Sequence, residues 1–260
     1  MRFVLPILTV LFAAQIAFGQ YYGAIRVDQR GLSKDYQIVK KYRLQIESGI
    51  SYMSDTDIPG IPNLEEQQVN LAQTLLRFGL SKHFELRMGS QMVYRRQKLL
   101  AWKHSVTTIG GMFVGAKWQF LQHKKGLLPN TSLLARINLP VGSKEIVSSK
   151  IEPQGGIVAS HPLSEAARLN YNVLVCYRDQ SFLEYFYAAQ LVVDFSPQTS
   201  AFIEFAGIDP DNARGQVIFD GGLTLLAKRN LMFMLYGGKG LNNVAPDWFV
   251  RFGVGVRLPR

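Results

Sequence analysis

The chain has 260 residues, of which 47% are hydrophobic, 12% aromatic and 18% charged, with 29 basic against 19 acidic side chains. This composition is too apolar for a disordered protein, and the length suffices for one substantial domain. The single cysteine, Cys176, excludes both a disulfide framework and a cysteine-ligated zinc cluster. The basic residues are scattered rather than gathered into a stripe, so we expect no nucleic-acid partner.

Residues 1–19 have the features of a secretory signal peptide. Arg2 gives a positive start, residues 3–14 form an apolar run, and Ala17 and Gly19 are small residues at the −3 and −1 positions. The run is shorter than the roughly 20 apolar residues that a membrane-spanning helix needs. We therefore predict cleavage before Gln20.

After residue 20 the dominant feature is alternation with a period of two. Near the C-terminus, Val250, Phe252 and Val254 alternate with Arg251 and Gly253. Successive side chains of a strand point to opposite faces, so such a segment has one apolar and one polar face. No stretch beyond residue 20 approaches 18 uninterrupted apolar residues, which excludes a spanning helix there.

The alternation, read between turn signals, predicts about twelve strands. An even number is typical of single-chain membrane barrels, so we predict an all-β fold, a transmembrane antiparallel up-and-down β-barrel that occupies residues 43–260. The predicted strands cover residues 43–53, 67–80, 83–96, 106–122, 129–142, 150–161, 167–178, 182–196, 199–207, 215–228, 231–238 and 247–258.

A soluble β-sandwich or a lipocalin-like barrel is the alternative fold, in which the apolar faces would point inward. Long strands and many glycines on the polar face favour lipid on the outside. Aromatic residues near the predicted strand ends, where they would form interfacial girdles, point the same way. These residues are Tyr52, Phe84, Tyr94, Trp118, Tyr177, Phe195 and Trp248.

The predicted connections alternate in length. Short periplasmic turns and longer outer loops are typical of outer-membrane barrels, and they place both chain ends on the short-turn side. Residues 20–42 would then lie in the periplasm or fold inward as a partial plug, and both possibilities stay open. The short turns lie at residues 81–82, 164–165, 197–198 and 228–229, and the longer loops at 54–66, 97–105, 143–149 and 239–246.

Several motifs carry a resemblance to a known family. The runs TLLRFGLS at residues 74–81, FELR at 84–87, LPVGS at 139–143 and APDWF at 245–249 resemble the outer-membrane proteins of the MetA-pathway phenol-degradation transporter family. The resemblance covers roughly residues 40–260. It implies a barrel in the outer membrane that takes small molecules across, with outer-membrane lipid, lipopolysaccharide and the barrel-assembly machinery as partners.

If the apolar faces meet lipid, the charged residues at alternate positions line the lumen. They could cross-pair into a salt-bridged structural lumen or form a selective binding site. These candidates are Glu47, Glu85, Arg87, Arg95, Lys117, Arg136, Arg178, Glu184, Asp194, Glu204, Asp220, Arg251 and Arg257. A second set, Phe202, Met232, Met234, Tyr236 and Phe249, could form a path for an apolar solute or pack against a plug.

We therefore predict a passive channel for small molecules, hydrophobic or aromatic ones included. A plugged barrel with a structural or adhesive role is the first alternative, and a lipid-modifying enzyme is the second. Ser160 and His161 are adjacent, so their side chains point to opposite faces of a strand, which argues against catalysis. Paired aspartates such as Asp209 and Asp211 are typical of turns, so we expect no metal site there, and we expect no cofactor.

Overall fold

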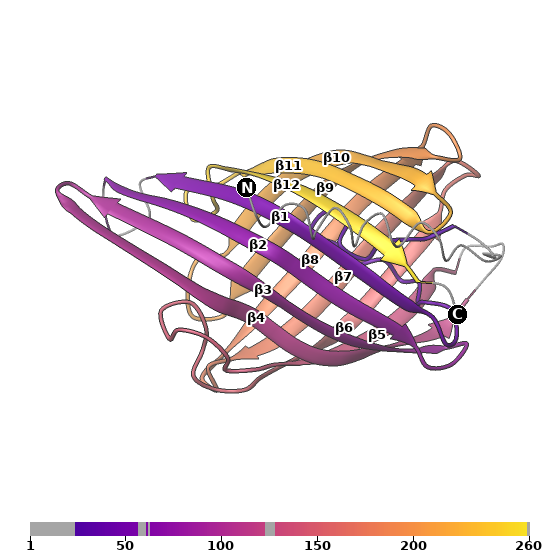
Figure 1. Cartoon of the computed structure of the whole chain (residues 1–260), viewed down its shortest axis with the longest axis horizontal. Coiled ribbons are helices and arrows are strands. Elements are labelled where there is room, and N and C mark those ends of the chain that lie inside the picture. The colour runs from indigo at the N-terminus through magenta and orange to yellow at the C-terminus, as the bar shows by residue number, and fades with distance from the viewer. Residues whose placement is uncertain (1–23, 57–60, 62, 123–127, 259–260) are drawn as a thin grey trace, which may run out of the picture.

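The strands form a closed antiparallel barrel. The computed structural model describes residues 24–56, 61, 63–122 and 128–258. Within that part of the chain every strand pairs with its sequence neighbours, and the last strand pairs with the first (Figure 1). The twelve strands found there are β1 (Leu44–Thr56), β2 (Leu64–Gly79), β3 (Phe84–Leu99), β4 (Trp102–Leu121), β5 (Asn130–Asn138), β6 (Glu152–Pro162), β7 (Ala167–Arg178), β8 (Phe182–Asp194), β9 (Thr199–Pro210), β10 (Gln216–Lys228), β11 (Leu231–Gly240) and β12 (Trp248–Arg257).

This topology confirms the predicted up-and-down barrel. Among the described residues there is no helix long and apolar enough to cross a membrane. The short connections 80–83, 163–166, 195–198 and 229–230 lie at one end, which we call the periplasmic end, and the opposite end is the outer end. The predicted signal peptide, residues 1–19, lies outside the described residues.

The hairpin of β3 and β4 differs from its prediction. Residues 97–105 were expected to form a loop, but the ladder continues until Leu99 pairs with Trp102. The polar residues of this stretch misled the prediction, because a hairpin that extends beyond the membrane can place polar side chains on both faces. A cross-strand ion pair between Lys98 and Glu65, 3.0 Å apart, supports the extension, which projects at the left in Figure 1.

The outer face of the barrel is apolar and the inner face is polar or small. On β12, Phe252 is 47% exposed, whereas Gly253 and Gly255 of the same strand face inward and are buried. On β7, Val173 is 55% exposed while Asn172 is buried. The predicted assignment of faces is therefore confirmed, and a soluble barrel with an apolar interior is excluded.

Aromatic side chains stand near both rims of this apolar surface. Tyr52 and Trp248 meet toward the outer end with ring centroids 5.1 Å apart. Trp118 and Phe120 lie near the periplasmic end with centroids 5.5 Å apart. Amphipathic rings favour the two membrane–water interfaces, so this arrangement fits a barrel that crosses a bilayer.

The segment before β1 lies inside the barrel. The N–H of Ile25 donates to the carbonyl of Arg229 in the β10–β11 turn at 2.8 Å, and the N–H of Tyr42 donates to the carbonyl of Gly79 at 2.6 Å. Both contacts are at the periplasmic end, so the chain enters and leaves the lumen through the same mouth. We call residues 24–41 the inner segment, an indigo trace within the barrel in Figure 1.

Candidate functional site

The inner segment has no regular secondary structure, and lumen carboxylates accept its backbone hydrogen bonds. Glu47 accepts from the N–H of Asp28 at 2.8 and 3.0 Å. Glu204, on β9, accepts from the N–H of Leu32 at 2.6 Å. An irregular buried backbone needs partners for its N–H groups, and here the lumen side chains supply them.

Lumen donors satisfy the carbonyl groups of the same segment in the same way. Hydrogen bonds from charged donors are stronger than those between neutral groups, so the two contacts from charged donors add most to the docking of the segment. The hydrogen bonds to these carbonyl groups run from Arg77 to Gln37 at 2.7 Å, from Lys117 to Asp35 at 2.6 Å, and from the amide of Gln190 to Arg30 at 2.9 Å.

A buried ion-pair network lies beneath these contacts. The Arg77 guanidinium lies 2.8 Å from the Glu47 carboxylate and 2.9 Å from the Glu85 carboxylate, and all three side chains are at most 2% exposed. Asp28 of the inner segment pairs with both Arg87 and Lys117. The network therefore contains three acidic and three basic groups, and one acid comes from the inner segment itself.

The pKa of Asp28 reflects this setting. Burial by itself would raise the pKa of its carboxyl group, but the cations of Arg87 and Lys117 hold the pKa well below its ordinary value. Asp28 is therefore ionised at neutral pH, and it fixes the inner segment to β3 and β4 electrostatically.

Apolar side chains complete the docking surface. Met232 and Met234 pack against Ile25 and Val27, and all four are buried. The Tyr236 hydroxyl donates to the carbonyl of Gly31 at 3.2 Å. Three of the residues that could form an apolar path, Met232, Met234 and Tyr236, thus contact the inner segment in this structure.

The other lumen candidates fall into separate groups. Asp220 lies opposite Glu204 in the β9–β10 ladder, and both carboxyls are buried. Arg178 pairs with Glu184 at 2.7 Å in the outer half. Asp194 pairs instead with Arg168 at 2.6 Å near the periplasmic end, and it joins neither of the other groups.

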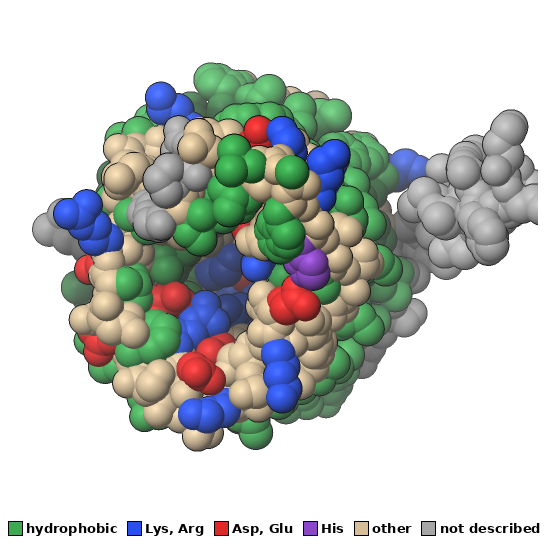
Figure 2. Space-filling model, turned by 90° about the vertical axis from the view of Figure 1, so that its left-hand side faces the viewer, with side chains coloured by type: hydrophobic (Ala, Val, Ile, Leu, Met, Phe, Trp, Pro, Cys, Tyr) green, Lys and Arg blue, Asp and Glu red, His purple; other side chains and the backbone are tan. Residues whose placement is uncertain are grey.

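The outer half of the lumen is a cavity of about 400 Å³ whose floor includes Asp28, Gln29 and Lys34 of the inner segment. Figure 2 looks into this end and shows basic side chains deep in the hollow. Seven basic side chains line it against two acidic ones, Asp28 and Glu152, among the described residues. The basic ones are Lys34, Arg87, Arg95, Arg136, Lys150, Arg178 and Arg251.

Two of these arginines have no acidic partner among the described residues. Arg251 contacts Gln29 and, at 3.3 Å, the Tyr236 hydroxyl. Arg136 stands over the Phe113 ring, with 4.7 Å between the guanidinium carbon and the ring centroid. The outer cavity therefore carries uncompensated positive charge.

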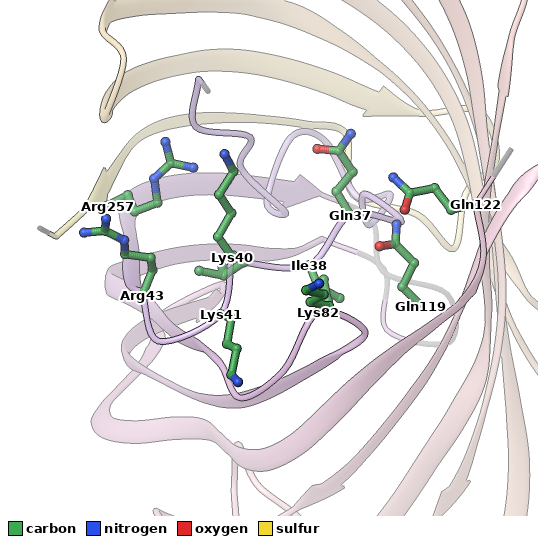
Figure 3. Close-up of a pocket in the computed structure, with 10 residues that line it drawn as sticks. Gln37, Ile38, Lys40, Lys41, Arg43, Lys82, Gln119, Gln122 and Arg257 are labelled. Atoms are coloured by element: carbon green, nitrogen blue, oxygen red, sulfur yellow. The ribbon is translucent and has the colours of Figure 1, made fainter. Parts of the chain in front are cut away.

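A second pocket lies at the periplasmic mouth, beside residues 37–41 of the inner segment. Its volume is about 510 Å³, and Figure 3 shows basic side chains around it. They are Lys40, Lys41, Arg43, Lys82 and Arg257. Both open ends of the lumen are thus bordered by cations, with the inner segment between them.

Sequence reasoning missed Arg77 and Asp28, which join the network described above. The alternation through Leu76, Arg77 and Phe78 places Arg77 on the inner face and could have identified it. Asp28 gives no such signal, because it precedes the first strand and has no periodic context. The alternation identified Arg87 as a lumen residue, but it did not identify Asp28 as the acidic partner of Arg87.

Comparison with known proteins gives a family. The family described as "Putative MetA-pathway of phenol degradation" matches residues 27–258, nearly the whole chain. The chain belongs to this family. The match begins within the inner segment, so it includes most of that segment as well as the barrel. A comparison with curated protein sequences finds no match.

Solved structures share the fold of this family member. An outer membrane channel from Pseudomonas putida F1 has a TM-score of 0.63 at 11% identity, over 86% of this chain and 98% of the other. The translocator domain of the autotransporter NalP from Neisseria meningitidis has a TM-score of 0.58 at 11% identity, over 84% and 89%. The transport unit of AIDA-I from Escherichia coli has a TM-score of 0.55 at 8% identity, over 96% and 97%.

These comparisons agree with the surface of the molecule. A closed barrel with an apolar outer face and aromatic rims has the surface of an outer-membrane protein, and its surroundings are outer-membrane lipid. We therefore place this family member in the outer membrane.

Proposed function

We propose that this protein is a passive outer-membrane channel for small solutes, closed by its inner segment and opened when that segment moves. The observation that carries the proposal is the division of the lumen into an outer cavity of about 400 Å³ and a pocket of about 510 Å³ at the periplasmic mouth, with the docked inner segment between them. In this scheme residues 20–42 are the plug and residues 43–260 the barrel, and the lumen candidates from Glu47 to Arg251 serve either docking or passage.

The path of the inner segment supports movement. Because it enters and leaves at the periplasmic mouth, it can swing out as a loop without being threaded through the barrel. Its contacts with the wall are hydrogen bonds, ion pairs and apolar packing, all of which are reversible. Water would hydrate the exposed lumen charges after the segment leaves, so the open state keeps a polar wall.

Membership in the family, together with the fold shared with an outer membrane channel from Pseudomonas putida, supports passage of small molecules. Outer-membrane lipid, lipopolysaccharide and the barrel-assembly machinery are the partners expected for such a barrel. We propose no enzymatic role. The ring of His161 lies 3.4 Å from the Tyr171 hydroxyl and that of His104 lies 2.8 Å from the Glu145 carboxylate, so both contact groups other than the neighbouring serines.

Single-channel recording of the refolded full chain in a planar bilayer tests the proposal. A gated channel gives brief conductance steps that grow more frequent with applied voltage. A barrel with a structural or adhesive role, closed permanently by the same contacts, gives no steps at any voltage, and that result would reject passage.

A further inference from the structure

We infer that the outer cavity contains a binding site for a small organic carboxylate, centred on Arg136. The inference rests on the proposed function only in treating this ligand as the class of solute that the channel takes. The site itself is argued from the geometry and charge of the cavity.

The position of Arg136 in the sheet gives the site its shape. On β4, Gly115 pairs with Arg136 of β5 on one side and with Arg87 of β3 on the other. A Cβ atom at Gly115 would lie 2.7 Å from the Cβ of Arg136. A side chain would not fit at this position, so the glycine lets two inward-facing arginines flank it closely, at the level where the cavity meets the inner segment.

The donors of these arginines are incompletely used. The Nε of Arg136 is buried without a hydrogen-bond partner, and so is the Nη1 of Arg87. No acidic group pairs with Arg136 in the part of the chain that the structure describes. Buried charged donors without acceptors are costly, and an anion between the two guanidinium groups would remove that cost.

The surroundings of Arg136 select a carboxylate with an apolar body. The Phe113 ring covers one face of the guanidinium, which leaves its planar edge for a forked pair of hydrogen bonds to a carboxylate. Apolar side chains form part of the wall of the same cavity: Met112, Phe113, Leu139, Ile146 and Val147. The volume is within the range of about 300–1,000 Å³ that small-molecule sites occupy.

The charge of the whole cavity favours the same ligand class. Lys34 and Arg251 line it with Arg136, and none of the three forms an ion pair with an acidic group among the described side chains. A second set of basic side chains stands at the periplasmic mouth. The positive field of the cavity concentrates anions near the site and repels cations.

Isothermal titration of the full chain in detergent micelles tests the site, with benzoate as the carboxylate probe. Arg136→Gln should weaken benzoate binding about tenfold or more, the loss expected for a hydrogen bond to a charged group. Arg136→Lys keeps the charge but loses the forked pair of hydrogen bonds, so its benzoate affinity should lie between those of the wild type and Arg136→Gln. Heat-modifiable migration on a gel verifies that each variant is folded.

Arg95→Gln is the matched control, because Arg95 lines the same cavity but pairs with Glu66 at 3.4 Å. It should change benzoate affinity less than about threefold, as expected for a partly exposed pair. Equal losses in the two variants would show diffuse attraction and overturn the site. Unchanged affinity in Arg136→Gln would overturn it too.

Two further probes separate the carboxylate from other ligands. Benzyl alcohol should not bind measurably, and inorganic phosphate should bind more weakly than benzoate. Benzyl alcohol binding as tightly as benzoate would reject the charge requirement, and phosphate binding equally well would reject the apolar body. Titration measures binding and does not require the solute to cross the barrel. Benzoate binding that depends on Arg136, in a barrel that gives no conductance steps, would therefore reject the channel function but support the binding site.

Discussion

The two halves of the lumen use charge in opposite ways. In the periplasmic half, Arg77, Glu47 and Glu85 are buried together, and acids balance bases around the inner segment. In the outer half, basic residues outnumber acidic ones around an open cavity. A balanced, desolvated network holds a segment in place, whereas an unbalanced, hydrated surface attracts an anion from outside. Docking and solute attraction are thus divided along one barrel.

The largest effect is expected from Arg77→Met, which removes the cation between Glu47 and Glu85. Leaving buried carboxylates without their partner should cost about 3–5 kcal/mol and release the inner segment. Trypsin can cut at Arg26 and Arg30 only when the segment has left the lumen, so its cleavage rate there should rise more than about a hundredfold. Cleavage at the wild-type rate would show that the network does not hold the segment.

Glu204→Gln should have the next largest effect. It weakens the acceptor for the N–H groups of Leu32 and Ser33, and charged hydrogen bonds of this kind contribute about 1.5–3 kcal/mol. Openings in single-channel records should become more frequent by about tenfold or more. Glu184→Gln is the control, since Glu184 pairs with Arg178 in the outer half and should leave the opening frequency unchanged.

Gly31→Ala tests the turn of the inner segment. Gly31 has φ of +69°, and an added Cβ would lie 2.8 Å from both the Gln190 amide and the Glu204 carboxylate. The strained backbone alone should destabilise docking by about 1–2 kcal/mol, measured by tryptic cleavage of the segment. Gly155→Ala, where the added Cβ meets its nearest atom at 3.5 Å, should match the wild type. Equal effects of the two changes would contradict the docked geometry.

The smallest effect on docking is expected from Arg95→Gln in the outer half. The Arg95–Glu66 pair is partly exposed, so its loss should cost less than about 1 kcal/mol. Tryptic cleavage of the inner segment should therefore stay close to the wild-type rate. A change as large as that of Arg77→Met would erase the distinction between the two halves.

The barrel could be predicted from the sequence because each strand carries its own signal. The alternation around Phe252 and Gly253 gives the face of β12 without reference to any other strand. The β3–β4 extension could not be predicted in this way, because beyond the membrane its residues face water on both sides and polarity no longer marks a strand. Pairing between Lys98 and Glu65 appears only when β2 and β3 are placed side by side.

The candidate site was predictable only in part. Inward-facing charges such as Glu47 and Lys117 follow from the alternation, but their partners do not. Lys117 contacts Asp28 and the carbonyl of Asp35, which belong to a segment without periodic pattern. A carboxylate that accepts hydrogen bonds from backbone N–H groups does not require particular side chains on the segment it binds. The sequence of the inner segment therefore gives little indication of where the segment docks.

The most direct test of the central claim is the conductance of a chain that lacks residues 24–40. If the inner segment alone closes the periplasmic half, this variant should show a steady open current in planar bilayers, while the full chain remains closed for most of the record. Heat-modifiable migration on a gel verifies that the shortened chain is folded. If this folded variant shows the same closed record as the full chain, the barrel wall itself closes the lumen, and the division of the lumen described above is wrong.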